Sequence, residues 1–356
     1  MAKGLSALVG FARVSLDAHW PAPTTVNPVA DTPGAEGEYA AACPTAAGPD
    51  DYRLDGARLR ALTRIDARWS MGHIAWEWIC ILACAWLCER YFSWPIWLLA
   101  CVCIGSRLHA LGIMAHDGTH GLLFRNRRLN DLVVELLLAW PVFLSLPAYR
   151  QMHKQHHRLL NTAEDPDWAR NRPDRLATSR GWLEFLRIMG GINGEQRQLL
   201  RFVGANSPAE KPMVPRLLIF AVVVGAAVAT GSLALVGKYW LAPFFSWFLL
   251  SMRLKGTAEH FAVENTEACN AARTLRPGIF ARLLIAPKNV HFHIEHHLYP
   301  SVPFYRLPAL HAALMEMPGF RERAHLTSSY PQYLLECLRT AKAGEHKGGP
   351  RLRPVP

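Results

Sequence analysis

The sequence predicts an all-α integral membrane protein with four transmembrane helices arranged as two hairpins. The chain has 356 residues, of which 51% are hydrophobic and only 19% are charged. Soluble globular chains usually carry about 25% charged residues. The apolar residues are concentrated in a few long runs, and basic stretches separate these runs, as in membrane proteins with cytoplasmic loops. Composition therefore disfavours a secreted disulfide scaffold, a disordered protein and a nucleic-acid-binding module.

Four apolar runs predict the spans. A helix needs about 20 residues to cross the hydrocarbon core of a bilayer, so most of the runs must include part of their flanks. The predicted spans are approximately 72–90, 92–114, 214–237 and 239–253. Two very short links, Glu89-Arg90 and Lys238, join them into hairpins. A further run, 132–149, contains a glutamate and two prolines, which favours an interfacial or re-entrant helix over a fifth span.

The remaining segments divide the chain into three parts. Residues 1–51 are rich in Pro, Ala, Gly, Thr and Asp beyond a short amphipathic start, a composition typical of a disordered tail. Residues 52–335 form the predicted membrane domain, and residues 336–356 form a basic C-terminal tail.

Charge predicts the orientation of the chain in the membrane. The net charge is +11, from 39 Lys and Arg against 28 Asp and Glu. Residues 115–215 hold fourteen of the basic residues, and residues 253–356 hold another fourteen. The positive-inside rule places both segments, and with them both termini, in the cytoplasm. Because the basic residues flank apolar runs, we expect them to face a lipid bilayer surface rather than nucleic acid.

Histidine clusters are the strongest functional signal. Nine of the sixteen histidines lie in three short clusters, and His260 stands alone after the fourth run. The first cluster pairs His116 with His120, a spacing that places both on one helix face. The other two clusters have the pattern HxxHH and are listed here: His153, His156 and His157; then His293, His296 and His297, with His291 just before them.

So many imidazoles predict two metal ions. A single first shell holds about four to six ligands, fewer than the eight or nine available here. Imidazole suits zinc, copper, iron and nickel. A nitrogen-rich dinuclear site beside buried hydrocarbon favours iron and O₂ chemistry, although the spacing alone leaves the metal open. A metal transporter and a zinc hydrolase are the rival classes. A transporter would need polar ligands at the middle of the bilayer, whereas these clusters lie at the ends of spans or in basic segments.

The three histidine clusters, called boxes from here on, occur in this order with an apolar hairpin between the second and the third. They resemble the histidine boxes of the membrane fatty-acid desaturase and hydroxylase superfamily. The most specific segments are 289–300, with the sequence NVHFHIEHHLYP, and the second box followed by Asn161-Thr162 and by 165–167. The resemblance covers roughly residues 70–330. It implies four spans beneath a cytosolic helical cap that holds the metal site, two non-haem irons as the cofactor, and O₂ as co-substrate. The ligands that it implies are His116, His120, His153, His156, His157, His260, His293, His296 and His297.

One departure concerns the residue four positions before His260. Acyl-CoA desaturases carry an asparagine there, and this chain has Gly256. Glu259 and Glu264 are the nearby replacements. The third box resembles acyl-lipid desaturases and bacterial carotenoid-type hydroxylases at least as well. The expected reaction is therefore introduction of a double bond into a fatty-acyl chain, as in acyl-lipid desaturases. The alternative is hydroxylation or ketone formation on a lipid, a carotenoid or a small metabolite.

Further expectations concern partners and outer residues. The chain contains no haem-binding motif, and its eight cysteines form no cluster-binding quartet. We therefore expect a separate electron-donor protein of the ferredoxin, cytochrome b5 or rubredoxin type, an acyl substrate, and a location in a bacterial inner membrane. Four acidic residues are expected to orient ligand imidazoles: Asp117, Asp165, Asp167 and Glu295. His109 is expected to be a polar residue of the helix bundle, with an approach to the site as the alternative, and His291 an orienting or capping residue rather than a ligand. No metal role is assigned to His19, His73, His311, His325 and His346.

Overall fold

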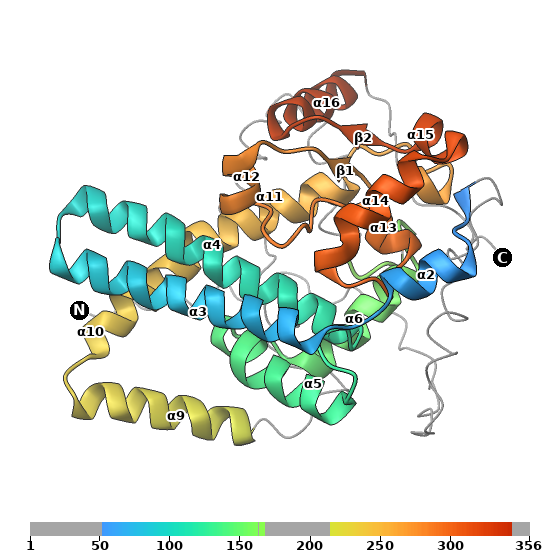
Figure 1. The fold of residues 1–356 in the computed structure, drawn as a ribbon. Coiled ribbons are helices and arrows are strands. Elements are labelled where there is room, and N and C mark those ends of the chain that lie inside the picture. Colours follow the sequence, from blue (N-terminus) through green and yellow to red (C-terminus); the bar gives the residue numbers. More distant parts are fainter. Residues whose placement is uncertain (1–51, 163, 168–213, 344–356) are drawn as a thin grey trace, which may run out of the picture. The chain divides into compact units, whose positions relative to one another are not determined.

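The computed structural model describes residues 52–162, 164–167 and 214–343, so the predicted tail 1–51 lies outside the described residues (Figure 1). The described part is helical except for two short strands. Its N-terminal half contains α2 (Gly56–Leu62), α3 (Ala67–Arg90), α4 (Trp94–Thr119), α5 (Arg127–Val134), η4 (Glu135–Ala139), η5 (Trp140–Val142) and α6 (Leu146–Arg158). After the gap come α9 (Val214–Ala229), α10 (Leu233–Val236), η7 (Gly237–Leu241), η8 (Phe244–Phe248) and α11 (Leu249–His260).

The C-terminal region contains short elements, of which the last helix is the longest. These are η9 (Ala268–Asn270), β1 (Thr274–Leu275), α12 (Ile279–Leu284), α13 (His293–Leu298), η10 (Phe304–Arg306), α14 (Leu307–Met315), α15 (Pro318–Arg323), β2 (Leu326–Thr327) and α16 (Tyr330–Ala343). The strands β1 and β2 pair in parallel, with Thr274 opposite Leu326. The antiparallel bridge between Thr274 and Phe292 ties this pair to the segment that leads into α13.

Helices α3 and α4 form the first hairpin, and they run antiparallel in Figure 1. Asp66 caps the start of α3 by accepting a hydrogen bond from the Arg68 amide. Ser93 caps α4, and a proline follows in the first turn, where its missing N–H costs nothing. The link is Tyr91–Ser93, so the helices meet just after the predicted position.

The second predicted link, at Lys238, is wrong. Helix α9 ends at Ala229, and a helical stretch then runs without interruption from Leu233 to His260. The turn lies at Thr230–Ser232, where Gly231 has a φ of +67°, a conformation that glycine adopts without a steric penalty. Lys238 lies inside this helical stretch. Its long side chain reaches Glu89 at the end of α3 and forms an ion pair there. A charged residue in an apolar run was therefore a false boundary signal.

The run expected to be interfacial or re-entrant is bent sharply. The segments Arg127–Val142 and Leu146–Arg158 meet at an angle of 89°. Phe143, at the bend, has a φ of +60°, which ends the first segment. This bend is the geometry of a re-entrant loop or a broken span, and it excludes a straight fifth helix over 132–149.

Three described helices are long and apolar enough to cross a membrane: Gly56–Arg90, Trp94–Thr119 and Leu233–His260. A fourth candidate span is added if the bent pair, Arg127–Val142 and Leu146–Arg158, counts as one. Helix α9 is apolar but shorter, over Pro215–Ala229. Large apolar side chains remain exposed along α3 and α9, among them Leu82, Trp86 and Val222. Such an exposed apolar surface is typical of helices that contact lipid.

Two glycines let neighbouring helices approach α4 closely. A Cβ atom on Gly105 would lie 2.7 Å from Cβ of Trp247, just before the end of η8. A Cβ atom on Gly118 would overlap the side chain of Val134 on α5. Small residues at such crossings are typical of packed membrane helices. Helix α4 thereby becomes the central helix, and it carries the first histidine box at its C-terminal end.

A buried ion cluster joins the hairpin of α3 and α4 to the segment that precedes the third histidine box. Glu77 on α3 is fully buried and lies 3.1 Å from Arg107 Nη1 on α4 and 2.7 Å from Lys288 Nζ. Lys288 Nζ also lies 3.0 Å from Nδ1 of His73. We call Glu77, Arg107 and Lys288 the Glu77 ion cluster. Lys288 and Asn289 have φ values of +56° and +58°, so the cluster holds a sharply turned segment that leads into α13.

The domain extends beyond its predicted end at residue 335. Helix α16 continues to Ala343, and Cys337 in it is buried. Glu336 lies 3.1 Å from Nη2 of Arg273, a fully buried arginine that also donates to the backbone carbonyls at the end of α11. Residues 336–343 therefore belong to the folded domain, and only 344–356 of the predicted tail lie outside the described residues.

Candidate metal centre

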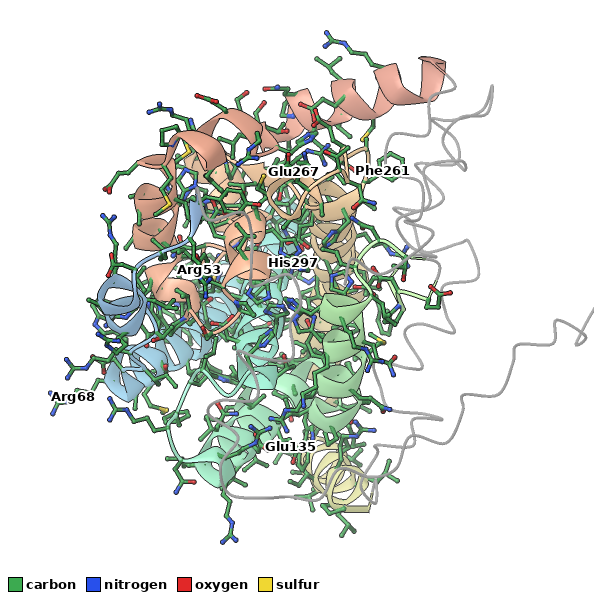
Figure 2. All side chains as sticks on the ribbon, turned by 90° about the vertical axis from the view of Figure 1, so that its right-hand side faces the viewer. Arg53, Arg68, Glu135, Phe261, Glu267 and His297 are labelled. Carbon is green, nitrogen blue, oxygen red and sulfur yellow. The ribbon has the colours of Figure 1, made fainter. Side chains whose placement is uncertain are left out.

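The nine predicted histidines converge from four helices. His116 lies in the last turn of α4 and His120 follows as its C-terminal cap. Helix α6 begins at a Ser145 cap with a proline in its first turn, and it carries the second box. His260 is the last residue of α11, and α13 carries the third box. Every member of the set is buried except the half-buried His120, and Figure 2 shows His297 in the interior of the fold.

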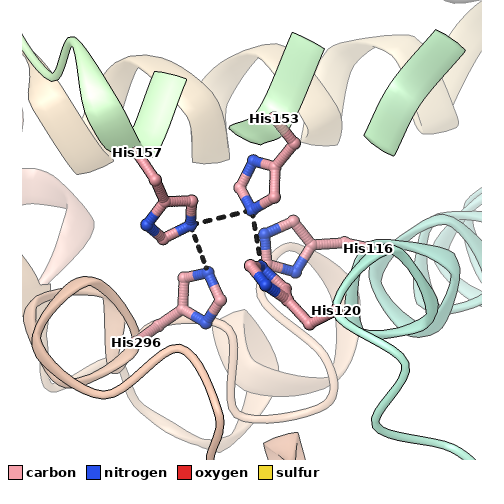
Figure 3. A group of neighbouring side chains, drawn as sticks. All are labelled: His116, His120, His153, His157 and His296. Carbon is pink, nitrogen blue, oxygen red and sulfur yellow. Dashed lines mark hydrogen bonds between the residues drawn. The ribbon is translucent and has the colours of Figure 1, made fainter. Parts of the chain in front are cut away.

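The histidines form two adjoining groups. The first contains His116, His120, His153, His157 and His296 (Figure 3), and the second contains His156, His260, His293 and His297. Within each group, one ring nitrogen from every member lies within 4.8 Å of all the others. Each HxxHH box supplies both groups. Its first and last histidines, four residues apart on one face, join one group, and its middle histidine joins the other.

Nitrogen contacts in the first group match the shell of a metal ion. His153 Nε2 lies 2.9 Å from Nε2 of His120 and 2.9 Å from Nε2 of His157, which lies 3.1 Å from Nε2 of His296. A neutral imidazole has one N–H donor and one acceptor. Hydrogen bonds among these four Nε2 atoms therefore do not give each of them a partner. Two nitrogens bound at right angles to one ion, each about 2.1 Å from it, lie about 3 Å apart.

The second group has the same pattern. His293 Nε2 lies 2.8 Å from Nε2 of His260 and 3.1 Å from Nε2 of His297. The ring of His156 lies 4.8 Å from the ring of His260, measured between centroids. The rings of His157 and His297, one from each group, are 4.4 Å apart. The donor sets therefore fit two neighbouring ions, while the role of each histidine as a ligand stays a prediction.

Asp165 orients His156 as expected. Its two carboxylate oxygens lie 2.9 and 3.1 Å from Nδ1 of His156. Because a carboxylate only accepts hydrogen bonds, Nδ1 donates and Nε2 keeps its lone pair for a metal. The backbone amides of Asn161 and Asp167 donate to the same carboxylate and fix its position. Asp167 itself lies farther away, 3.8 Å from Nδ1 of His156.

Glu259 lies close to Nδ1 of His293, on the side of the ring away from the other histidines' Nε2 atoms. Its Oε1 lies 3.3 Å from Nδ1 of His293, and its Oε2 lies 2.8 Å from Nζ of Lys255. Glu259 belongs to neither histidine group, and neither does Glu264, which accepts from Asn270. Either glutamate could replace the missing asparagine by sequence. Within the described residues, Glu259 lies beside Nδ1 of His293, whereas Glu264 lies beside Asn270.

The other two acidic residues differ from each other. Asp117 lies 3.6 Å from Nδ1 of His116, and its other oxygen accepts from the Phe304 amide. Within the described residues, Glu295 pairs with side chains other than the boxed histidines. It accepts from Thr274 Oγ1 and pairs with Nδ1 of His311. The expectation for Glu295 was therefore wrong, and His311, to which no role had been assigned, fixes the buried carboxylate of α13.

Burial keeps the imidazoles of α13 neutral. Burial, followed by the neighbouring histidines, holds the pKa of His296 and His297 well below the ordinary value of 6.5. A neutral imidazole is the form that binds a metal. His291 is also buried, which lowers its pKa to about 4, but it belongs to neither group. His109 is buried, lines a cavity shared with histidines of both groups, and has its ring 6.1 Å from that of Phe248, but it likewise belongs to neither group.

The remaining histidines have other contacts. His73 lies beside Lys288, and His325 Nε2 is 3.4 Å from Glu336 Oε2. His19 and His346 lie outside the described residues.

A cavity of about 80 Å³ opens beside both groups. His116 and His153 of the first group and His156, His260 and His293 of the second line it. Its apolar wall comes from five side chains: Ile113, Leu144, Met152, Phe248 and Met252. Three charged residues also line it, namely Asp167, Lys255 and Glu259. A molecule bound in this cavity would lie next to histidines of both groups.

Comparison with known proteins identifies the family of this chain. The family model for fatty acid desaturases matches residues 92–328. Dihydrorhizobitoxine desaturase of Bradyrhizobium elkanii is 29% identical over 71% of this chain and 77% of its own length. The chloroplastic omega-6 fatty acid desaturase of Spinacia oleracea is 24% identical over 64% of this chain, and the match spans just over half, 55%, of that protein. A beta-carotene ketolase of a Paracoccus strain is 26% identical over 56% of this chain and 72% of its own length. With its histidine boxes gathered into two buried groups, the chain belongs to the fatty acid desaturase family.

Proposed function

We propose that this protein is an integral-membrane, O₂-dependent oxidoreductase that holds two non-haem irons and introduces a double bond into a saturated carbon chain. The observation that carries the proposal is the division of nine histidines into buried groups of five and four. Family membership supports an oxidoreductase with non-haem iron. The nitrogen contacts of about 3 Å support two ions rather than one.

The two irons, when bound, supply the oxidant for an unactivated C–H bond. For each double bond, two hydrogens leave adjacent carbons. O₂ takes up these two hydrogens, two electrons and two further protons, and leaves as two molecules of water. The electrons come from a separate donor protein of the ferredoxin, cytochrome b5 or rubredoxin type. The chain's own residues hold and orient the metals. Asp165 keeps Nε2 of His156 unprotonated, and Glu259 lies 3.3 Å from Nδ1 of His293.

The proposed substrate is an apolar carbon chain, with a fatty-acyl chain as the first candidate. Five apolar side chains line the cavity beside the histidines, and the relatives from chloroplasts are omega-6 fatty acid desaturases. The Bradyrhizobium relative, however, is a desaturase of dihydrorhizobitoxine. Desaturation of a substrate other than a fatty acid is therefore compatible with this scaffold.

A second candidate reaction is oxygen insertion. Similarity to a beta-carotene ketolase supports hydroxylation or ketone formation on a lipid, a carotenoid or a small metabolite. The two outcomes differ in the product, because insertion adds an oxygen atom and desaturation removes two hydrogens.

Metal analysis tests the proposal. We expect about two irons per chain, and little zinc, in protein purified from a host grown with iron. Mass spectrometry of products formed under ¹⁸O₂ then distinguishes the two reactions, since desaturation leaves no label in the product. Active protein containing zinc and no iron would overturn the proposal.

Orientation gives an independent prediction. We propose that both termini and all the boxes face the cytoplasm, with the hairpin turns at Tyr91–Ser93 and Thr230–Ser232 on the other side. Reporter fusions after Gly204 and Lys347 are expected to give cytoplasmic signals, and fusions after Tyr91 and Gly231 external signals. An external signal at Gly204 would place the first and second boxes on opposite faces. A core of about 30 Å separates those faces, so one metal site could not join them.

A further inference from the structure

We infer that the substrate of this site carries a free carboxylate close to the carbon that reacts, and that Lys255 binds this carboxylate. The inference rests on the proposed function and narrows its substrate class from any apolar chain to a small acid.

The first step is the position of Lys255. It lines the same cavity as five of the histidines, and its side chain is 16% exposed. A single carboxylate, that of Glu259, lies between its ammonium group and His293, with contacts of 2.8 and 3.3 Å. Lys255 is the one lysine or arginine among the described residues that line this cavity. A substrate near the metals therefore lies within reach of this ammonium group.

The second step is the binding capacity of the ammonium group. It has three N–H donors, and the ion pair recorded for it within the described part of the chain is the one with Glu259. A substrate carboxylate would accept from the remaining donors. Charge-assisted hydrogen bonds of this kind are the strong ones in proteins.

The third step is charge balance. Nine neutral imidazoles give two divalent ions no compensating charge, and Lys255 adds another positive charge beside them. Of the cavity's carboxylates, Glu259 already faces Lys255, and Asp167 lies toward His156. An uncharged acyl chain brings no negative charge into this partly buried space, whereas a carboxylate does. The ion pair with Glu259 already balances Lys255, so a substrate carboxylate would offset the charge of the bound metal ions, and an acid is the better match.

The fourth step is size. Lys255 and His260, five residues apart on α11, line the same cavity. The cavity is also small, at about 80 Å³, against roughly 300–1,000 Å³ for pockets that hold drug-sized ligands. Its apolar wall then holds the short carbon chain while Lys255 holds the head.

Binding of hexanoate and of methyl hexanoate to the iron-loaded protein tests the inference. Calorimetry and the spectrum of the reduced iron centre both report binding without turnover. We expect the wild-type protein to bind hexanoate more tightly than its methyl ester. In the Lys255→Met variant, the dissociation constant for hexanoate should rise at least about tenfold, while that of the ester and the iron content stay unchanged. Lys238→Met is the matched control, because Lys238 lies on the same helical stretch and also pairs with a glutamate.

The other outcomes are distinct. If Lys255→Met lowers iron content, or weakens acid and ester equally, Lys255 only holds Glu259 in place and the inference fails. It also fails if wild-type protein does not bind hexanoate, or if it desaturates stearoyl chains of phosphatidylglycerol vesicles with no dependence on Lys255. In this last case the proposed function stands. Protein without iron, or without O₂-dependent oxidation of any of these probes, would instead remove the proposed function itself.

Discussion

Replacing His156 by alanine is expected to abolish O₂-dependent turnover and to lower the iron content below two per chain. His156 belongs to the smaller histidine group, so its loss leaves three nitrogens for the second ion. The change also removes the donor to Asp165 and leaves that carboxylate buried beside an empty space. Changes behind a metal ligand typically cost 10–100-fold in affinity or activity, and loss of a ligand should cost at least about a hundredfold. Iron analysis and product formation on the same purified sample measure both effects.

The control for this experiment is His325→Ala. His325 is a histidine of the same domain that lies near Glu336 and belongs to neither group. It should retain wild-type iron content and activity. His296→Ala tests the larger group, and it should also abolish turnover, because His296 Nε2 lies 3.1 Å from Nε2 of His157. Near-normal activity of both the His156 and His296 variants would contradict the proposed ligand roles.

Replacing Glu77 by alanine is expected to cause the largest loss of stability of any single change in the membrane helices. Glu77 is fully buried and faces two cations, Arg107 at 3.1 Å and Lys288 at 2.7 Å. Removing one partner of a buried ion pair costs about 3–5 kcal/mol, because the remaining charges stay buried without compensation. Thermal unfolding in detergent measures the loss, and iron retention on heating reports whether the third box moves with it.

Glu89→Ala is the matched comparison. Glu89 also pairs with a lysine across two helices, but it is largely exposed and contacts Lys238 at the protein surface. Exposed pairs contribute about 0–1 kcal/mol, so the unfolding temperature should change little. The double variant Glu77→Ala with Lys288→Ala should recover part of the loss, since one uncompensated charge is removed with its partner. Equal effects of Glu77→Ala and Glu89→Ala would contradict a structural role for the buried cluster.

The sequence predicted the clustering of the histidines better than the helix boundaries. The HxxxH and HxxHH spacings place the members of each box within about one helical turn, so they lie close together. The spacings did not predict which histidine belongs to which group. That division depends on how α6 and α13 face each other, so His156 joins His293 rather than its neighbour His157. Contacts between distant segments leave no periodic trace in a sequence.

The boundary errors have a related cause. Lys238 looked like the end of a span, and its partner Glu89 lies 149 residues earlier in the chain. The actual signal was Gly231 with its positive φ, flanked by Thr230 and Ser232, whose hydroxyl groups lie 2.8 Å apart. Likewise, the basic composition of 336–356 gave no indication that helix α16 continues into this segment, where Glu336 pairs with the buried Arg273. His311 had no sequence signal, since its partner Glu295 is sixteen residues away on another helix.

The Glu77 ion cluster has a consequence for the order in which the protein is made. Glu77 and Arg107 lie on consecutive helices, so the two charges can enter the bilayer already paired when the first hairpin inserts. Lys288 is synthesised some 180 residues later and completes the cluster only when the segment before α13 arrives. Both histidine groups include members of α13. A ribosome-bound chain that stops short of this helix therefore has neither histidine group complete, and we expect the proposed iron loading to follow synthesis of nearly the whole domain.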